Sequence, residues 1–417
     1  MEKLLLMGIN TRVLLDSASK LDNYQTFSVS YFSTLDMKKP YKEKYILKQK
    51  SGKSCGIFEE SYNLKDLLDL SLEYMEEVDK IILTTGISPN DFKGKYKKYK
   101  KKIIGNHNTE SIEDKYRFYK KIKNDFLVPK TFKFKYSNDI ARDNIDEIVE
   151  ILKQYDDKSF ILKPHEGSGG YGVQLLKYNK EKLLNNNYLE KLFSYYNNQE
   201  FLIQEYIEGE NISSSVLATK NRSKAIMTSK MLTESDFGDK DSFKYSGNIL
   251  PYSNILNSEI INDKIINKKT VLNEIAEKII SKFGLIGSNG VDMIIKDENN
   301  EESIYIIEVN PRFQGTYESI EKVLGVNLLK AHIKSCEGEL INVPKAKCCS
   351  IKRIIYTNKR VQVGNLAINN VYDIPYDGVI IEKNQPLATI ISYGNSVENV
   401  KYKMNKAILE IDENIYS

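Results

Sequence analysis

Three side chains with hard oxygen atoms stand on two apolar segments in the second half of the chain. Asp292 lies within Gly290–Ile294, and Glu308 and Asn310 lie within the run Ile306-Ile-Glu-Val-Asn-Pro-Arg312. If these segments are strands, Glu308 and Asn310 face the same side, because side chains alternate along a strand. Buried carboxylates are costly without a partner, and hard oxygens around an open site suit Mg²⁺ held jointly with ATP phosphates. A structural salt bridge between Asp292 and Arg312 is the weaker alternative.

A lysine followed by a glycine-rich loop forms a second candidate. Phe160–Lys163 is typical of a strand, and the loop from Gly167 to Val173 contains four glycines. Glycine lets several backbone N–H groups point at one anion, and Lys163 adds a point charge for phosphate. The loop lacks the G-K-[ST] ending of a Walker A loop. A plain hairpin with glycines for turn geometry remains an equal alternative for this motif alone.

An apolar strand that runs into an acidic segment, Phe201–Glu210, is the third candidate. The backbone of such an edge can read an adenine ring, and a carboxylate beyond it can accept both ribose hydroxyls. The expected nucleotide contacts are Gln204, Glu205, Tyr206, Ile207 and Glu210. On its own, a strand that ends in a solvated acidic turn explains this segment better.

The elements that must position these motifs change character along the chain. Strands are predicted at 4–9, 26–31 and 80–86, with helices at 12–21 and 64–77. Strands that alternate with helices indicate a parallel sheet, whose ligands bind at the carboxyl ends of the strands, here near Gly8–Arg12 and Thr84–Ser88. At Gly8 the sequence does not continue into a G-x-G-x-x-G dinucleotide fingerprint.

Further along, the pattern favours strands on either side of a helix, followed by a β-rich tail. A helix with an N-cap at Ser111 is predicted before residue 119, and later helices are predicted at 268–283, 318–336 and 397–407, with strands at 288–296 and 303–309. The predicted domains are 1–106, 107–343 and 344–417. The fold class is therefore multidomain, α/β and α+β.

Other residues could contact a substrate. Arg12 follows the first strand and could clamp a carboxylate or phosphate, although a surface residue at a helix N-terminus is an equal alternative. Tyr317 and Glu318 follow the Asn-Pro-Arg turn and could line an acceptor pocket, although a helix N-terminus explains Glu318 equally well. The basic run Lys93–Lys102 alternates lysine with tyrosine. A solvated helix or connector is expected there rather than a nucleic-acid patch.

Composition excludes several classes of function. A formal net charge of +4 over 417 residues gives no reason to expect nucleic acid or an anionic membrane as the main partner. The four cysteines form no C-x-x-C pair and there are only three histidines, which disfavours a zinc or iron–sulfur site. No stretch approaches the roughly 18 apolar residues of a membrane span, and free thiols suit a reducing cytoplasm.

Together, the motifs from about residue 103 to residue 340 resemble the ATP-grasp superfamily, with Glu308-Val-Asn-Pro-Arg312 as the most specific match. The resemblance implies a Rossmann-like N-terminal domain, an ATP-grasp domain and a small β-rich C-terminal domain. It implies phosphate contacts from Lys115 and Lys163 and a flap that includes Gly167, Ser168, Gly169, Gly170 and Val173. Glu205 and Ile207 would meet adenine through their backbone, and Glu210 would meet the ribose.

The same resemblance implies that Asp292, Glu308 and Asn310 hold one or two Mg²⁺ ions, with Mn²⁺ as a substitute. It also implies that Arg312 steadies the γ-phosphate or the acyl phosphate formed from it, and that Arg312 and Lys163 are the catalytic residues. D-alanine–D-alanine ligases carry an arginine where this chain has Gly290, which puts a dipeptide-ligase substrate in doubt. The expected activity is the ATP-dependent coupling of a carboxylate to an amine through an acyl phosphate, with release of ADP and phosphate.

The alternatives are a carboxylase that uses bicarbonate and a non-catalytic ATP-binding regulatory protein. The intact set of Asp292, Glu308, Asn310 and Arg312 argues against the second, because a degenerate binder has no need for all four. The expected partners are small-molecule carboxylates and amines, without a membrane. The C-terminal segment is expected either to cover the site or to mediate a homodimer.

Overall fold

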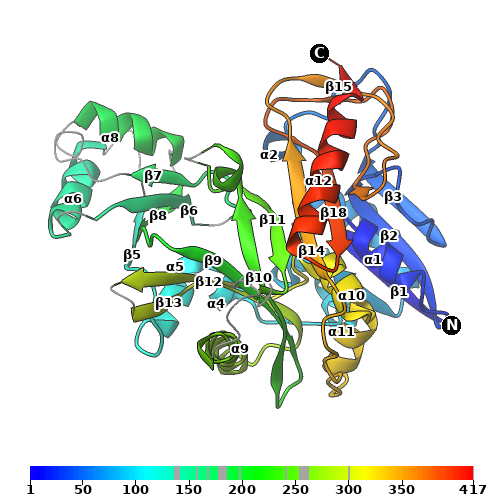
Figure 1. Cartoon of the computed structure of the whole chain (residues 1–417), viewed down its shortest axis with the longest axis horizontal. Coiled ribbons are helices and arrows are strands. Elements are labelled where there is room, and N and C mark those ends of the chain that lie inside the picture. The colour runs from blue at the N-terminus through cyan, green and yellow to red at the C-terminus, as the bar shows by residue number, and fades with distance from the viewer. Residues whose placement is uncertain are drawn as a thin grey trace.

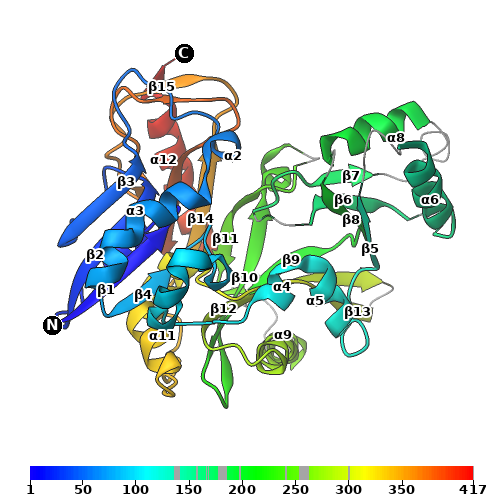
Figure 2. The ribbon, with the colours of Figure 1, turned by 180° about the vertical axis from the view of Figure 1, so that it is seen from behind.

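The structure is a computed structural model of the 417-residue chain (Figure 1). It describes residues 1–135, 141–155, 158–165, 167, 169–176, 186–196, 199–239, 242–252, 263–298 and 301–416. A small antiparallel sheet with two helices lies at one side of the molecule, and a parallel sheet lies at the other (Figures 1 and 2). A long antiparallel sheet runs between them. These layers confirm the predicted mixed, multidomain class.

The N-terminal sheet is parallel, as the alternation of strands and helices predicts. Its order is β3-β2-β1-β4, and its strands are β1 (Glu2–Gly8), β2 (Tyr24–Phe32), β3 (Lys42–Leu47) and β4 (Lys80–Leu83). Its helices are α1 (Arg12–Ala18), the short α2 (Phe58–Ser61) and α3 (Leu64–Glu77). Both faces of β1 are buried, which explains its continuous apolar sequence.

A short connecting region links the N-terminal sheet to the rest. The 3₁₀ helices η1 (Pro89–Asp91) and η2 (Gly94–Lys102) are followed by α4 (Glu110–Glu113) and α5 (Lys115–Ile122). From behind, α4 and α5 lie between the two outer sheets (Figure 2). The predicted N-cap at Ser111 is wrong. Asp114 caps α5 instead, accepting hydrogen bonds from the backbone N–H groups of Tyr116 and Arg117, because α4 ends before α5 begins.

The small sheet is antiparallel with the order β5-β8-β6-β7. Its strands are β5 (Thr131–Lys135), β6 (Phe160–Pro164), β7 (Gln174–Leu176) and β8 (Glu200–Glu205). Helices α6 (Ala141–Lys153) and α8 (Asn186–Phe193), with the turn η4 (Ser194–Tyr196), pack on the sheet through a core that includes Ile148, Phe193 and Phe201.

The large sheet has the order β13-β12-β9-β10-β11-β14-β18-β16 and is antiparallel throughout. Its strands are β9 (Glu210–Ala218), β10 (Ser223–Thr233), β11 (Tyr245–Leu250), β12 (Gly287–Glu298), β13 (Glu301–Asn310), β14 (Cys349–Tyr356), β16 (Val371–Tyr372) and β18 (Pro386–Gly394). The turn η5 (Glu234–Phe237) follows β10. Helix α9 (Asp263–Lys282) covers the buried side of β9 and β12.

The predicted helix at 318–336 is two helices, α10 (Tyr317–Leu324) and α11 (Leu328–Cys336). Gly325 ends α10 with φ +69°, a conformation that suits glycine at a helix C-terminus. Asn327 then caps α11 by accepting a hydrogen bond from the backbone N–H of Lys330. The break turns the chain so that both helices pack in one core with residues of the N-terminal sheet.

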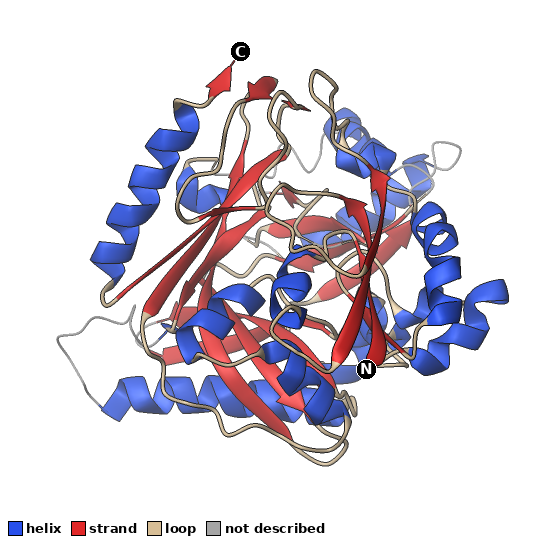
Figure 3. Cartoon of the chain, turned by 90° about the vertical axis from the view of Figure 1, so that its right-hand side faces the viewer, coloured by secondary structure: helices blue, strands red, loops and turns tan. Residues whose placement is uncertain are grey.

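The C-terminal segment has a core of its own that includes Val363, Ile390 and Met404. Helix α12 (Val397–Asp412) lies along its strands (Figure 3). A three-stranded sheet of β15 (Val361–Val363), β17 (Ile380–Ile381) and β19 (Ile415–Tyr416) completes it. The domain boundaries near 106 and 343 stay predictions. Because β11 and β14 are hydrogen-bonded to each other, the large sheet continues across the predicted boundary near residue 343.

Candidate nucleotide and metal site

The carboxylates at the end of the β12–β13 hairpin share the floor of one cavity. Asp292 lies opposite Glu308, and Gly290 lies opposite Asn310. All three polar side chains line a cavity of about 400 Å³ between the small sheet and the large sheet. The other face of the same strands, including Val291 and Ile306, is buried against α9. The structure therefore brings the three predicted metal ligands together.

A β-bulge in β13 aims these ligands. Opposite β12 the register shifts between Asp292 and Met293, so that Met293 pairs with Ile306 and Asp292 pairs with Glu308. Ile307 is the extra residue. Side chains two apart normally share a face, yet Ile306 is in the core whereas Glu308 lines the cavity. The bulge changes the phase of the strand and turns Glu308 toward Asp292.

The electrostatics of this floor favour a cation. Burial and the neighbouring Glu308 together raise the pKa of Asp292 to about 7, although hydrogen bonds from Ser213 and Asn310 act in the opposite direction. Ser213 Oγ donates to Asp292 Oδ1 at 2.6 Å, and Asn310 Nδ2 donates to Asp292 Oδ2 at 2.8 Å. Two neighbouring, partly buried carboxylates cannot both be ionised cheaply without a positive partner.

The donor set fits Mg²⁺ that is shared with phosphates. Within the described ranges, no group of three or more His, Cys, Asp and Glu side chains could hold a metal ion. Asp292 and Glu308 supply only two carboxylates, with the Asn310 amide oxygen as a neutral donor. Mg²⁺ uses one or two carboxylates and completes its shell with water and phosphate oxygens, so the set suits a metal that arrives with a nucleotide.

Lys163 and the glycine loop form the opposite wall of the cavity. Lys163 is 6% exposed and donates to Gln204 Oε1 at 2.9 Å, and Gln204 Nε2 donates to Thr131 at 2.8 Å. Burial lowers the pKa of Lys163 to about 8, and the nearby Lys115 contributes to the decrease. Lys115 donates to the backbone carbonyl of Gly167 at 2.6 Å. Two ammonium groups thus meet beside the loop, where an anion would relieve their repulsion.

The glycine loop lies against the strand that begins at Tyr245. The backbone N–H of Tyr245 donates to the carbonyl of Gly169 at 3.0 Å. Gly170 has φ +76°, and a Cβ there would approach the carbonyl oxygen of Phe243 to 2.0 Å. Gly167, Gly169, Gly170 and Val173 all line the cavity, whereas Ser168 lies outside the described residues. At Gly170, glycine is therefore required by both conformation and space.

The predicted adenine segment lies along the same cavity. Gln204, Glu205, Tyr206 and Ile207 all line it. The carboxylate of Glu205 is held by Lys158 at 2.5 Å, and the backbone N–H of Glu205 donates to Lys130. The carboxylate of Glu205 is therefore engaged within the fold, and an adenine contact through its backbone stays a prediction.

Glu210, the predicted ribose contact, has other partners. Tyr252 donates a hydrogen bond to its carboxylate, and Lys230 forms an ion pair with it at 3.1 Å. Its neighbour Asn211 lines the cavity instead, on the same side of β9 as Ser213. Asn211 and Ser213 are the site residues that the sequence reasoning missed. Their spacing of two along a strand is the signal that could have found them.

Arg312 stands in the wall between two cavities. It lines both the 400 Å³ cavity and a larger one of about 1110 Å³ on the side of the N-terminal sheet. Its guanidinium donates to Asn310 Oδ1 at 3.0 Å and to the carbonyl of Phe313 at 3.2 Å. Burial lowers the pKa of Arg312, whereas Glu308 and Asp292 raise it. No direct ion pair between Asp292 and Arg312 is found in the described residues.

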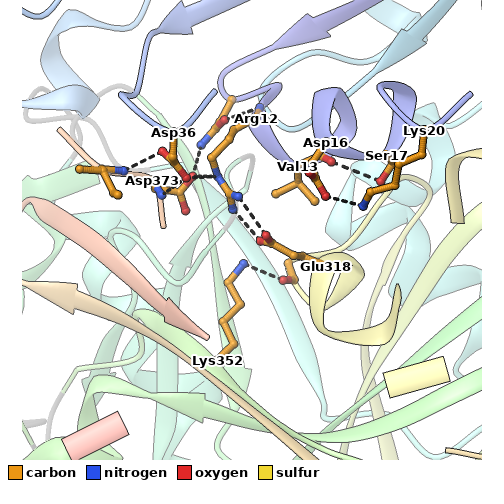
Figure 4. A network of polar contacts seen from close by, with 12 residues as sticks. Arg12, Val13, Asp16, Ser17, Lys20, Asp36, Glu318, Lys352 and Asp373 are labelled. Carbon is orange, nitrogen blue, oxygen red and sulfur yellow. Dashed lines mark hydrogen bonds and ion pairs between the residues drawn. The ribbon is translucent and has the colours of Figure 1, made fainter. Parts of the chain in front are cut away.

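The N-terminal residues contribute differently from the prediction. Ser88 and Gly86 line the larger cavity, but Arg12 does not reach either one. Arg12 is 3% exposed and binds both carboxylate oxygens of Glu318, at 2.9 and 2.6 Å, and Asp373 at 2.7 Å (Figure 4). The proposed substrate clamp is wrong, because internal carboxylates already occupy this guanidinium.

The same charged network extends to the loop that follows Arg312. Lys352 donates to the carbonyl of Gly315 at 2.8 Å, three residues before Glu318 (Figure 4). Burial would raise the pKa of Asp373, but Arg12 and Lys352 hold it well below its usual range. Glu318 is therefore a link between segments rather than an acceptor contact, and Tyr317 lies in a hydrophobic core.

Comparison with known proteins agrees with this arrangement. A family model described as an ATP-grasp domain matches residues 112–316, which contain the glycine loop, β8 and the β12–β13 hairpin. An uncharacterized protein of Methanocaldococcus jannaschii is 30% identical over 419 residues, which is 99% of this chain and 92% of that protein. The chain belongs to the ATP-grasp family.

Two further matches show the range of activities around this ATP-grasp chain. The tyramine–L-glutamate ligase of Methanocaldococcus fervens is 28% identical over 173 residues, 41% of this chain and 43% of the ligase. The biotin carboxylase domain of the Hydrogenobacter thermophilus 2-oxoglutarate carboxylase, solved with MgADP and bicarbonate, has a TM-score of 0.69 at 17% identity, covering 97% of this chain and 89% of that one. The latter likeness concerns the fold.

Ligases are among the matched relatives of this family, whose ATP-grasp domain is an ATP-binding one. None of the helices within the described ranges is both long enough and apolar enough to cross a membrane. The four cysteines are free thiols.

Proposed function

We propose that this ATP-grasp protein is a Mg·ATP-dependent ligase that activates a carboxylate as an acyl phosphate and couples it to an amine. The observation that carries the proposal is the wall between the two cavities. Lys163 and Asp292 line the nucleotide cavity on one side of it, a larger cavity that a second molecule can enter lies on the other, and Glu308 lines both. Arg312 reaches both.

The reaction divides between these two cavities. A carboxylate oxygen of the substrate attacks the γ-phosphorus of ATP, the bond to the β,γ-bridging oxygen breaks, and ADP leaves. The amine nitrogen then attacks the acyl carbon, phosphate leaves, and the amine proton is transferred to that phosphate. Phosphoryl transfer of this kind depends on positioning and on neutralisation of charge, so a nucleophilic side chain is not required.

The chain's own residues supply the neutralisation. Lys115 and Lys163 would bind the phosphates from the loop side, and Arg312 would stabilise the charge that develops on the transferred group. Asp292, Glu308 and Asn310 would hold Mg²⁺, which supplies a Lewis acid for the phosphate oxygens. The glycine loop, anchored to Tyr245, would exclude water that could hydrolyse the acyl phosphate.

Carboxylation with bicarbonate as the activated acid is the second candidate. The observation that favours it is Arg312, which the carboxylase-like branch of the family carries and D-alanine–D-alanine ligases lack. A requirement of turnover for bicarbonate rather than for an organic acid and an amine would distinguish it.

Isotope exchange within ATP tests the first step without knowledge of the amine. ATP labelled with ¹⁸O in the β,γ-bridge is incubated with single carboxylic acids or bicarbonate, and movement of the label to a non-bridging β-position is measured. Exchange that depends on one acid is expected, because reversible acyl phosphate formation frees the β-phosphate to rotate. Glu308→Ala should abolish the exchange, whereas Glu301→Ala, at an exposed position of the same strand, should retain it.

Release of ADP and phosphate with acid and amine together then identifies the second substrate. Failure of Mg·ATP to bind would refute the proposal, as would exchange that Glu308→Ala leaves intact.

A further inference from the structure

The larger cavity has a basic wall that the proposed chemistry does not use. It lies between the N-terminal sheet and the β12–β13 hairpin and shares Lys115, Glu308 and Arg312 with the nucleotide cavity. Its far side is formed by the basic run Lys93–Lys102, of which Lys93, Lys97 and Lys100 line the cavity. An occupant of this cavity would therefore touch the reacting centre at one end and these lysines at the other.

The basic run is a 3₁₀ helix with three different faces. Residues three apart are eclipsed in a 3₁₀ helix, so η2 sorts its side chains into three rows. Tyr96 and Tyr99 form a buried row whose hydroxyls bond to Asp69 and Glu76 of α3. The tyrosines therefore cannot stack on bases, which removes the feature that suggested a nucleic-acid patch.

The second row binds the same acids. Lys95 forms an ion pair with Asp69, and Lys98 forms one with Glu76. The third row holds Lys97 and Lys100, which face the cavity. In the part of the chain that the structure describes, no hydrogen bond or ion pair joins the amino groups of Lys93, Lys97 and Lys100 to another side chain. One helix thus separates lysines that stabilise the fold from lysines that do not.

Four of the five described acids that line the cavity are bonded elsewhere, and the fifth is Glu308 of the candidate metal site. Glu110 binds Arg117 at 2.9 Å, and Glu113 accepts hydrogen bonds from Asn90 and Thr109 at 2.8 Å. Asp114 caps α5 and binds His165, and Asp91 caps η1 through the backbone N–H of Ser88. Within the described residues, none of these acids therefore binds the amino groups of Lys93, Lys97 and Lys100.

We propose that the larger cavity binds an acid substrate that carries a second anionic group, a carboxylate or a phosphate, and that Lys97 and Lys100 bind this group. The carboxylate to be activated would lie beside Arg312 at the other end. This inference rests on the proposed function and narrows its substrate from any carboxylic acid to a molecule with at least two separated negative charges.

Calorimetric titration of small anions tests the proposal. The chain is first saturated with Mg²⁺ and a non-hydrolysable ATP analogue, so that the probes do not occupy the phosphate positions. Linear dicarboxylates and ω-phosphonocarboxylates of increasing length are then titrated, each beside the monocarboxylate of equal length. For at least one length, the dianion should bind about tenfold more tightly, since each partly exposed ion pair contributes up to about 1 kcal/mol.

The two rows of lysine provide matched variants. Two double variants each remove two positive charges from η2: Lys97→Ala/Lys100→Ala and Lys95→Ala/Lys98→Ala. Any effect of the lost positive charge alone should therefore be equal in the two. The preference for dianions should disappear in the first variant and persist in the second. It should also weaken as salt is added. Comparison of dicarboxylates with phosphonocarboxylates shows which anion the lysines prefer.

Three outcomes would overturn the proposal. These are equal binding of dianions and monoanions by the wild type, an equal loss of the preference in both double variants, and a preference that persists in Lys97→Ala/Lys100→Ala. If the ATP analogue itself does not bind with Mg²⁺, the proposed function fails and this inference fails with it. The binding of the ATP analogue, measured first, therefore distinguishes failure of the nucleotide site from failure of the proposed substrate class.

Discussion

Asn211 and Glu210 are neighbours on β9 with opposite surroundings. Asn211 lines the nucleotide cavity, and Glu210 binds Tyr252 and Lys230 away from it. An asparagine amide can both donate to and accept from ribose hydroxyls. Asn211→Ala should therefore weaken ATP binding by roughly 3- to 10-fold, the range for one hydrogen bond of about 1 kcal/mol. Fluorescence titration with a labelled ATP analogue measures this.

Glu210→Ala is the matched control. It should leave the affinity for ATP unchanged within about twofold while lowering thermal stability, because it removes the acceptor of one Tyr252 hydrogen bond and the carboxylate of the Lys230 ion pair. The reverse result, with Glu210→Ala as the variant that loses ATP, would restore the ribose contact that the family resemblance implies.

His332 is a buried residue whose hydrogen bonds fix its neutral form. Its Nδ1 accepts from the backbone N–H of Ser288 at 2.9 Å, so its Nε2 donates to the carbonyl of Ile104 at 3.0 Å. Burial lowers the pKa of His332 to about 4. The unfolded chain therefore binds more protons between pH 6.5 and 4, and stability is lost as pH falls through this window, by up to about 3 kcal/mol.

Urea unfolding across this pH range measures the effect. The pH-dependent part of the difference between wild type and His332→Phe should equal that loss, because the variant has no ring proton to gain. His107→Gln should keep the wild-type slope. If wild type and His332→Phe lose stability in parallel, acid sensitivity arises elsewhere.

At the residue scale, the sequence indicates which groups meet but not how they are aimed. Asp292, Glu308 and Asn310 could be paired from their positions on two apolar strands. The bulge at Ile307 could not be predicted, because it depends on the register between β12 and β13, and the sequence of one strand does not reveal that register. Glu210 was predicted and its neighbour Asn211 was not considered, because β9 carries polar residues on both faces and packing on α9 decides which face meets the cavity.

The glycine loop is the element on which access to the nucleotide cavity depends. Gly170→Ala introduces a side chain at φ +76° with its Cβ 2.0 Å from the carbonyl of Phe243. Either the loop or the Phe243 segment must move, so the KM for ATP should rise roughly tenfold, in line with a left-handed strain of about 1–2 kcal/mol. Steady-state kinetics of ADP release with the identified acid measures it.

Gly238→Ala provides the control for backbone strain alone. Gly238 also has a positive φ, +115°, but a Cβ there would meet no atom within 4 Å. Its KM for ATP should stay near that of the wild type. An equal rise in both variants would show that the contact with Phe243 does not control the loop.

Elements with a regular apolar period were predicted well. The helix at 64–77 agrees with α3, and the strands at 288–296 and 303–309 fall within β12 and β13. β3 was missed because its sequence, Lys-Glu-Lys-Tyr-Ile-Leu, is half charged, and pairing with β2 decides its conformation. The break between α10 and α11 was missed because a lone glycine is also tolerated inside a helix.

For the whole molecule, the network around Arg12 joins three distant parts of the sequence. Arg12→Met would leave Glu318, Asp373 and the nearby Asp36 without their guanidinium. Removal of one partner from a buried charge pair costs about 3–5 kcal/mol, so the free energy of unfolding should fall by that amount. Urea unfolding followed by circular dichroism measures it.

Lys20→Met breaks the surface ion pair with Asp16 and serves as the comparison. Exposed pairs contribute about 0–1 kcal/mol, so this variant should unfold close to the wild type. Equal destabilisation by the two substitutions would mean that the Arg12 network has no more influence on stability than a surface pair.

The whole-molecule arrangement was only partly predictable. The order of a parallel N-terminal unit, a central unit and a β-rich tail follows from the changing element pattern. The sequence pattern does not predict that the C-terminal segment continues the central sheet. The β11–β14 pairing joins residues about one hundred positions apart through backbone hydrogen bonds, which leave no mark on side-chain composition.

That pairing decides how segments could be exchanged among relatives. A chimera that took its C-terminal segment, residues 344–417, from another ATP-grasp protein would have to pair a foreign strand with β11 rather than attach an independent domain. At the junction, Gly247 has φ +143° and no room for a Cβ, which would lie 1.9 Å from the carbonyl oxygen of Lys352. The recipient must therefore keep this glycine, whereas the donor strand is constrained there only by its backbone.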